Sequence, residues 1–181
     1  IRLEIEGNLD ESCDLILINH QSMLDIIVME HLHNRNIAWV AKKEITDLFF
    51  FGHIIKAPRM ISIDRENKAG LIHLLSEAKD RLSKGRPIAM FPEGTRSDGT
   101  YIGEFKAGAK MVGNKFNLKV QPVVMFNTRN IVNSQKMEAS PGVVKVIYLK
   151  PVVASKDTSW YEDCEKNMKE VFEKEYKNYV S

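Results

Sequence analysis

Residues 15–25 read Leu-Ile-Leu-Ile-Asn-His-Gln-Ser-Met-Leu-Asp (LILINHQSMLD), an apolar run that gives way abruptly to polar residues. The run at 15–18 is typical of a buried strand. His20 follows at once, and Asp25 comes five residues later. Residues five apart on a helix point roughly 140° away from each other, so these two can meet only if His20 stays in the turn before the helix. An imidazole held by a carboxylate is a common base for activating a hydroxyl group.

The same stretch also has a structural explanation, as the start of a helix. Ser22 and Asp25 form an S-x-x-D pattern, which caps a helix when an apolar run follows. The apolar residues that come next predict a helix from about Met23 to Leu32. Capping explains Ser22 and Asp25 but not His20, so this stretch alone leaves both interpretations open.

The composition limits the kind of protein. The chain has 181 residues, 44% of them hydrophobic, which suits one globular domain spanning residues 1–181. Its formal net charge of +2 is too small to indicate nucleic-acid binding. Cys13 and Cys164 match neither a metal-binding spacing nor a disulfide framework, which favours a reducing cytosolic setting. The apolar stretch at 48–55 is far shorter than the ~20 residues that span a bilayer.

Strand-like and helix-like segments alternate along the chain, most strands being rich in Val and Ile. Strands are predicted at residues 1–6, 14–19, 37–41, 60–63, 87–91, 119–126 and 143–149. Apolar residues at three- and four-residue spacing predict helices near 71–82, 106–117 and 160–179. The pattern indicates a single α/β domain with a mixed, largely parallel sheet of about seven strands flanked by helices. Ligands of such sheets bind beyond the carboxyl ends of strands, where residues 19–25 lie.

A second predicted strand, at 87–91, runs into Pro-Glu-Gly-Thr-Arg-Ser at residues 92–97. Gly94 permits close approach to the backbone, Thr95 offers a hydroxyl, and Arg96 offers a planar fork suited to phosphate. The stretch lacks the glycine spacing and the lysine of a nucleotide-binding P-loop. By itself it also fits a polar turn with a solvated ion pair.

A third predicted strand, at 60–63, is followed by Asp64 and Arg65, which also fit a turn at the start of a helix. Taken together, the three strand ends offer a base and two arginines suited to phosphate. This combination is harder to explain by turns alone.

These stretches resemble the motifs of the glycerolipid acyltransferases. NHQSMLD, residues 19–25, resembles their NH-x4-D signature, and FPEGTRS, residues 91–97, resembles their acceptor-binding signature. ISIDR at 61–65 and VQPVV at 120–124 are similar to their third and fourth blocks, and Gly103–Gly108 falls where such sequences place like residues. Order and spacing agree from about Gly7 to Pro151. The resemblance is nearest to the members that acylate lysophosphatidic acid.

The resemblance implies a role for each motif. His20 would take a proton from the acceptor hydroxyl, and Asp25 would hold the other ring nitrogen. The residues expected to bind the glycerol phosphate are Glu93, Gly94, Thr95, Arg96, Arg65 and Lys106.

The reaction implied is acyl transfer from acyl-CoA or acyl carrier protein to the free hydroxyl of 1-acyl-sn-glycerol 3-phosphate, which gives phosphatidic acid. A thioester is already activated, so we expect neither a metal nor another cofactor. Other acceptors remain open: glycerol 3-phosphate, another lysophospholipid or a lipid A precursor. So does a non-catalytic module that binds lipid or acyl carrier protein. A serine hydrolase using Ser22 is disfavoured, because the chain has no G-x-S-x-G motif.

We also expect the protein to work at the cytoplasmic face of a bacterial membrane without crossing it. The apolar residues Leu48, Phe49, Phe50, Phe51, Ile54 and Ile55 are flanked by Lys42, Lys43 and Lys56. This pattern suits anionic lipid, although the same residues also fit a core helix. The chain opens on Ile1 inside a strand pattern, so we expect the family's hydrophobic anchoring segment to be absent from it.

Overall fold

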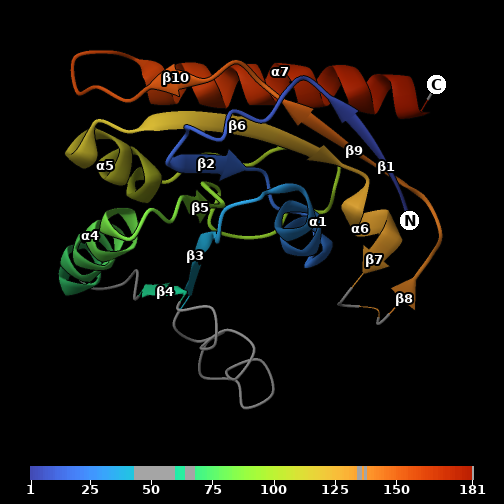
Figure 1. Ribbon diagram of the computed structural model, residues 1–181. Coiled ribbons are helices and arrows are strands. Elements are labelled where there is room, and N and C mark those ends of the chain that lie inside the picture. Colours follow the sequence, from blue (N-terminus) through green and yellow to red (C-terminus); the bar gives the residue numbers. More distant parts are fainter. Residues whose placement is uncertain (43–59, 64–67, 134–135, 137, 181) are drawn as a thin grey trace.

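The computed structural model describes residues 1–42, 60–63, 68–133, 136 and 138–180 (Figure 1). The apolar stretch at 48–55, the lysines at positions 43 and 56, and Arg65 lie outside the described residues. No helix in the described part of the chain is long and apolar enough to cross a membrane.

An eight-stranded mixed sheet forms the centre of the domain (Figure 1). The strands follow the order β1-β9-β6-β2-β5-β3-β4, and β10 pairs with β6 outside this row. Pairing is parallel throughout the row except between β6 and β9, and β10 is also antiparallel to β6. The strands are β1 Arg2–Glu6, β2 Leu15–Ile18, β3 Ala38–Lys42, β4 Ile61–Ile63, β5 Ile88–Met90, β6 Lys119–Phe126, β9 Val143–Tyr148 and β10 Val152–Val153. The mixed, largely parallel sheet and its seven predicted strands are confirmed.

Helices cover both faces of the sheet. They are α1 Leu24–Leu32, α4 Lys68–Ser83, α5 Ala107–Phe116, α6 Thr128–Ile131 and α7 Trp160–Val180. The predicted helices are confirmed to within a few residues. The short helix α6 and the small hairpin of β7 (Val132–Asn133) and β8 (Glu138–Ala139) were not predicted, because segments of two to four residues carry no readable periodicity.

The side chains of β2 show how the two faces are filled. Leu15 and Leu17 point into the cluster under α4, α5 and α7, and Ile16 and Ile18 point into the cluster under α1. All four are fully buried. A strand covered on both faces needs such a continuous apolar run, which is why LILI shows no polar alternation.

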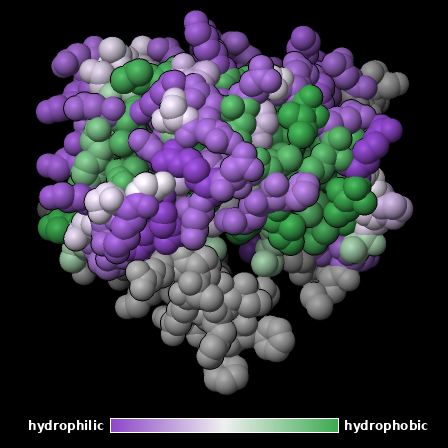
Figure 2. All heavy atoms as spheres, viewed as in Figure 1, coloured by the Kyte–Doolittle hydropathy of each residue, from purple (hydrophilic) through white to green (hydrophobic). Residues whose placement is uncertain are grey.

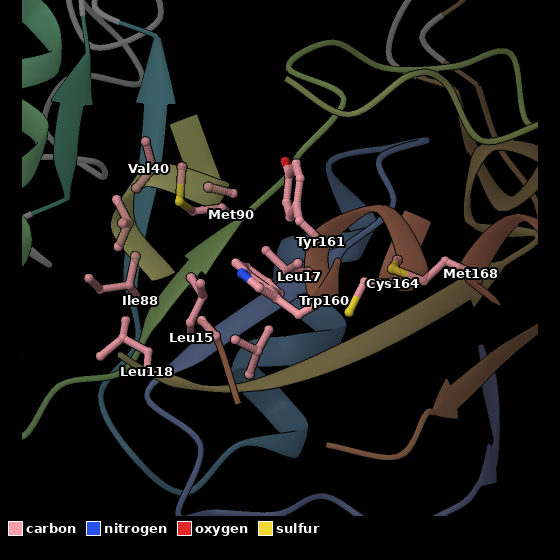
Figure 3. Close-up of a cluster of buried hydrophobic side chains, with 14 of the residues drawn as sticks. Leu15, Leu17, Val40, Ile88, Met90, Leu118, Trp160, Tyr161, Cys164 and Met168 are labelled. Carbon is pink, nitrogen blue, oxygen red and sulfur yellow. The ribbon is translucent and has the colours of Figure 1, made fainter. Parts of the chain in front are cut away.

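Helix α7 closes the larger cluster with Trp160, Tyr161, Cys164 and Met168, which meet Leu15 and Leu17 of the sheet (Figure 3). Gly113 of α5 lets α7 pack closely, because a Cβ at this position would lie 2.7 Å from the Trp160 ring. On the surface, apolar residues gather over the half of the viewed face that carries α1, α6 and β1, whereas hydrophilic residues dominate along α4 and α7 (Figure 2).

The topology brings the predicted motifs together. Strands β2, β5 and β6 are neighbours and parallel, so their carboxyl ends lie at one edge of the sheet. NHQSMLD follows β2, FPEGTRS follows β5, and α6 follows β6. The site is therefore assembled from three chain segments that are distant in sequence.

Candidate active site

His20 and Asp25 form the centre of the site. His20 lies in the turn between β2 and α1, and its Nδ1 is 2.9 Å from Asp25 Oδ2. The Asp25 side chain is fully buried, whereas the His20 side chain is 14% exposed. The ring therefore has one nitrogen anchored in the protein, and Nε2 is left to act on a bound molecule.

The Asp25 carboxylate is held from several directions. Oδ2 also accepts the backbone N–H groups of Gln21 and Ser22, both at 2.8 Å, and Oδ1 accepts the hydroxyl of Thr128 in a short hydrogen bond. Its bond from the Ser22 N–H is one half of the predicted capping box. The other half is not formed: the Asp25 N–H donates to Ser22 O at 3.3 Å, and Ser22 Oγ accepts the Leu24 N–H at 3.3 Å and donates to Val132 O at 2.6 Å. The helix begins one residue later than the box predicts, with Met23 as its N-cap. Capping and the His20 contact thus occur at the same carboxylate.

The second motif, residues 91–97, makes hydrogen bonds to the backbone of the first motif, residues 19–25. Glu93 Oε1 accepts the backbone N–H of His20 at 2.7 Å, and the backbone N–H of Ser97 donates to His20 O at 2.8 Å. Phe91 stacks on the imidazole with ring centroids 3.7 Å apart and an angle of 13° between the planes. FPEGTRS therefore determines both the position of the His20 backbone and the plane of its ring.

Glu93 is an internal carboxylate. Its side chain is buried, and its second oxygen accepts the backbone N–H of Gly103 at 2.7 Å. Burial raises the pKa of the Glu93 carboxyl above its ordinary value, and the hydrogen bonds from Gly103 and His20 oppose that rise only in part. Gly103 packs closely here, because a Cβ would lie 3.2 Å from Glu93 Oε2.

The end of β6 and the segment that follows it contact the first motif in three places. Asn19 Nδ2 donates to Met125 O at 2.9 Å, and Asn19 Oδ1 accepts the Met125 N–H at 2.7 Å. The Asn19 side chain thereby replaces the backbone of a neighbouring strand. Farther along the chain, the Thr128 hydroxyl donates a hydrogen bond to Asp25, and Val132 O accepts one from the Ser22 hydroxyl.

Besides Glu93, the described residues predicted to bind substrate lie in or beside the loop that follows β5. Gly94 adopts φ 76°, a left-handed conformation that favours glycine, in the turn after β5. Thr95 and Arg96 follow with exposed side chains. The exposed Lys106 lies beside the loop, because its backbone N–H donates to Pro92 O at 2.8 Å. The structure thus places four predicted side chains in two adjoining segments: His20 and Asp25 in the turn after β2 and the first turn of α1, and Glu93 and Arg96 in the loop after β5.

A separate cavity of about 510 Å³ lies beyond α6. It is lined by residues of β1, β9, α6 and α7, among them Asn127, Asn130 and Lys145. Neither His20 nor Asp25 lines it. His20 and Asp25 therefore lie outside this cavity.

Comparison with known proteins assigns the family. The family model described as Acyltransferase matches residues 2–126, which is more than half of the chain. The chain belongs to the Acyltransferase family. It is therefore an acyltransferase, and the family resemblance found in its motifs is confirmed.

Relatives agree with this assignment. The acyltransferase is 41% identical to the 1-acyl-sn-glycerol-3-phosphate acyltransferase of Helicobacter pylori, over 97% of this chain and 75% of that protein. It is 32% identical to the lyso-ornithine lipid O-acyltransferase of Brucella abortus, over 71% of this chain but only 50% of the relative. The fold is similar to the crystal structure of PlsC from Thermotoga maritima, with a TM-score of 0.76, 23% identity, and coverage of 99% and 73% of the two chains.

The roles of Asn19 and Thr128 in this acyltransferase were not predicted from the sequence. Asn19 stands beside the histidine, but its partner Met125 is 106 positions away. Thr128 comes just after a predicted strand, at the sheet edge that carries the other motifs. That position is the one signal in the sequence that points to it.

Proposed function

We propose that the protein transfers an acyl group from an acyl thioester, either acyl-CoA or acyl carrier protein, to the free hydroxyl of 1-acyl-sn-glycerol 3-phosphate. The products are phosphatidic acid and a free thiol. The observation that carries the proposal is the His20–Asp25 pair at the ligand-binding edge of the sheet, 2.9 Å apart. The printed name of the Helicobacter pylori relative supports the choice of acceptor.

His20 acts as the general base. Because Nδ1 is held by Asp25, Nε2 accepts the hydroxyl proton while the acceptor oxygen attacks the thioester carbonyl. The C–S bond then breaks, and the imidazolium returns the proton to the leaving thiolate. The buried carboxylate of Asp25 stabilises the imidazolium between these steps. The chemistry requires neither a metal nor another cofactor, because the thioester is already activated.

The acceptor phosphate binds on basic side chains of the predicted motifs. Arg96 is the principal ligand, since its planar guanidinium can donate two parallel hydrogen bonds to phosphate oxygens. Lys106 and Arg65 add positive charge, and Thr95 and the backbone at Gly94 add donors. Glu93 has a positioning role in this proposal, because one of its oxygens accepts the backbone N–H of His20 and the other that of Gly103.

A second acceptor class has specific support. The Brucella abortus relative is a lyso-ornithine lipid O-acyltransferase, so related chains act on lysolipids without a phosphate. An acceptor of this kind would gain little from Arg96. Competition between the two head groups separates the candidates.

We place the reaction at the cytoplasmic face of a membrane. A lysolipid acceptor carries a long acyl chain and resides in the bilayer, so the enzyme meets it at the membrane surface.

The test is direct. The purified protein is incubated with radiolabelled acyl-CoA or acyl carrier protein and a panel of lysolipids in vesicles, and the labelled product is identified. We expect labelled phosphatidic acid, and loss of the product in His20→Ala. The exposed His31, on α1, supplies the matched control, and His31→Ala should retain activity. Product formation that persists in a folded His20→Ala protein would disprove the mechanism.

A further inference from the structure

We infer that Thr128 is a positioning residue for catalysis, whose hydroxyl keeps Asp25 in the orientation that anchors His20. The inference rests on the proposed function. It starts from an asymmetry at the Asp25 carboxylate. Oδ2 is held by the His20 ring and by the backbone N–H groups of Gln21 and Ser22, whereas Thr128 is the partner of Oδ1 among the described residues.

The hydroxyl is the part of Thr128 that matters. Backbone N–H groups remain in place when a side chain is replaced, but the hydrogen bond to Oδ1 disappears with the hydroxyl. A carboxylate held on one oxygen can turn about its last bond, which moves Oδ2 away from His20 Nδ1. Thr128 and Asp25 are both fully buried, so water does not readily replace the missing donor.

The Thr128 hydroxyl lies within hydrogen-bond distance of two acceptors, Asp25 Oδ1 and Gln21 Oε1. A threonine has one hydroxyl proton, and a charged carboxylate is a stronger acceptor than an amide oxygen. The proton therefore goes to Asp25, and the Gln21 oxygen 3.2 Å from Thr128 Oγ1 has no donor. Turning the Gln21 amide by 180° brings Nε2 to this position, where it donates to Oγ1. The turn also satisfies Nε2, a buried group without a partner among the described residues. In this orientation of the amide, hydrogen bonds would run from Gln21 through Thr128 and Asp25 to His20.

The position of Thr128 is built into the fold. It is the first residue of α6 and follows Asn127, whose φ of 72° turns the chain sharply after β6. Asn127 Nδ2 donates to Val143 O at 2.9 Å and holds this turn to β9. The next residue, Arg129, donates to Ser97 O in the second motif at 3.5 Å. Helix α6 therefore contacts both catalytic motifs, and Thr128 is its contact with the carboxylate.

The experiment compares Thr128→Val, which removes the hydroxyl at nearly constant volume, with Thr128→Ser, which retains it. Thr158, exposed before α7, gives the matched control Thr158→Val. In Thr128→Val we expect kcat to fall about ten- to a hundredfold, the effect of losing a hydrogen bond to a charged group. The acceptor KM should change less than about twofold, because the lost interaction does not contact substrate. Thr128→Ser and Thr158→Val should stay near the unmodified protein.

A second readout does not depend on activity. The ¹⁵N shifts of the His20 ring, assigned by their loss in His20→Ala, report which nitrogen carries the proton. We expect the proton on Nδ1 in the unmodified protein and in Thr128→Ser, and a mixture of tautomers in Thr128→Val. Unchanged ring shifts and kcat in Thr128→Val would overturn the inference. So would equal losses in the valine and serine variants, since serine retains the hydroxyl. If the ring shifts change as expected but no lysolipid is acylated, the proposed function fails while the positioning role stands.

Discussion

Glu93 accepts the backbone N–H of His20 at 2.7 Å, although the two residues are 73 positions apart. The carboxylate uses its other oxygen on Gly103, so it joins the turn after β2 to the loop after the second motif. A residue that the family resemblance places in the substrate site thus has each of its carboxylate oxygens hydrogen-bonded to a backbone N–H group. Its effect on the reaction should pass through the position of His20.

Glu93→Gln tests this relationship. The glutamine amide has one acceptor oxygen, so either the His20 or the Gly103 N–H must face an N–H2 group. We expect kcat to fall at least about tenfold and the free energy of unfolding to drop by about 1–3 kcal/mol. The exposed Glu104 supplies the control, Glu104→Gln. Unchanged kcat in Glu93→Gln would contradict the positioning role, as would an increase confined to the acceptor KM.

The raised pKa of Glu93 also predicts a pH dependence of stability. Between the ordinary value of 4.5 and the raised pKa, the folded protein retains a proton that the unfolded chain releases. Glu93 therefore makes its full contribution to the free energy of unfolding below about pH 4.5. This contribution is lost as the pH rises through the pKa that Glu93 has in the folded protein. Denaturant titrations at several pH values measure it. The free energy of unfolding should fall across this window more steeply in the unmodified protein than in Glu93→Gln, and parallel curves would refute the prediction.

Two variants test separately the proposed base, His20, and the residue that anchors it, Asp25. His20→Ala should lower kcat by about 10²–10⁴ while the fold survives. In Asp25→Asn, the side-chain oxygen should stay where it accepts the Gln21 and Ser22 N–H groups, and the NH2 group takes the place of Oδ1 and donates to the Thr128 hydroxyl. The ring then keeps its anchor while the site loses the negative charge. We expect kcat to fall in this variant because the imidazolium is no longer stabilised. Full activity in folded Asp25→Asn would show that the charge is dispensable.

Arg96 distinguishes acceptor binding from donor binding. Arg96→Ala should raise the KM for lysophosphatidic acid far more than that for the acyl donor. Arg96→Lys should restore binding only in part, because it supplies charge without the two-pronged geometry. The exposed Arg2, on β1, supplies the control Arg2→Ala. A rise in the donor KM alone would assign Arg96 to the donor site.

We expect the Asn19 side chain to contribute to stability more than to the chemical step. Asn19→Ala leaves the buried N–H and C=O groups of Met125 without the partners that they have now. Each such group costs about 1–3 kcal/mol, so the free energy of unfolding should drop by roughly 2–4 kcal/mol. Chemical denaturation measures the change, with Asn36→Ala as the exposed control. A loss no larger than in Asn36→Ala would show that the amide is not needed to join β2 and β6.

The sequence was sufficient to predict the sheet and the two principal motifs. Runs such as LILI at 15–18 are long and apolar enough to specify buried strands, and the rule that ligands bind beyond the carboxyl ends of strands pointed to the segments that carry His20 and Glu93. The direction of the Glu93 side chain could not be predicted, because a carboxylate after a strand fits a substrate site and a backbone contact equally well. Thr128 was missed for a related reason: its partner is 103 positions away, and a threonine after a strand also fits an ordinary cap.

The first motif makes hydrogen bonds with the end of β6 and with the segment that follows it. These contacts have a consequence for how the protein folds. Asn19, Ser22 and Asp25 meet partners 106, 110 and 103 positions farther along the chain. Contacts of such separation form slowly, because a long loop must close before they offer any stabilisation. The N-terminal third of the chain therefore contains both residues proposed to be catalytic but cannot orient them until β6 has docked beside β2. Recovery of activity during refolding should lag behind the appearance of helical signal and coincide with completion of the sheet.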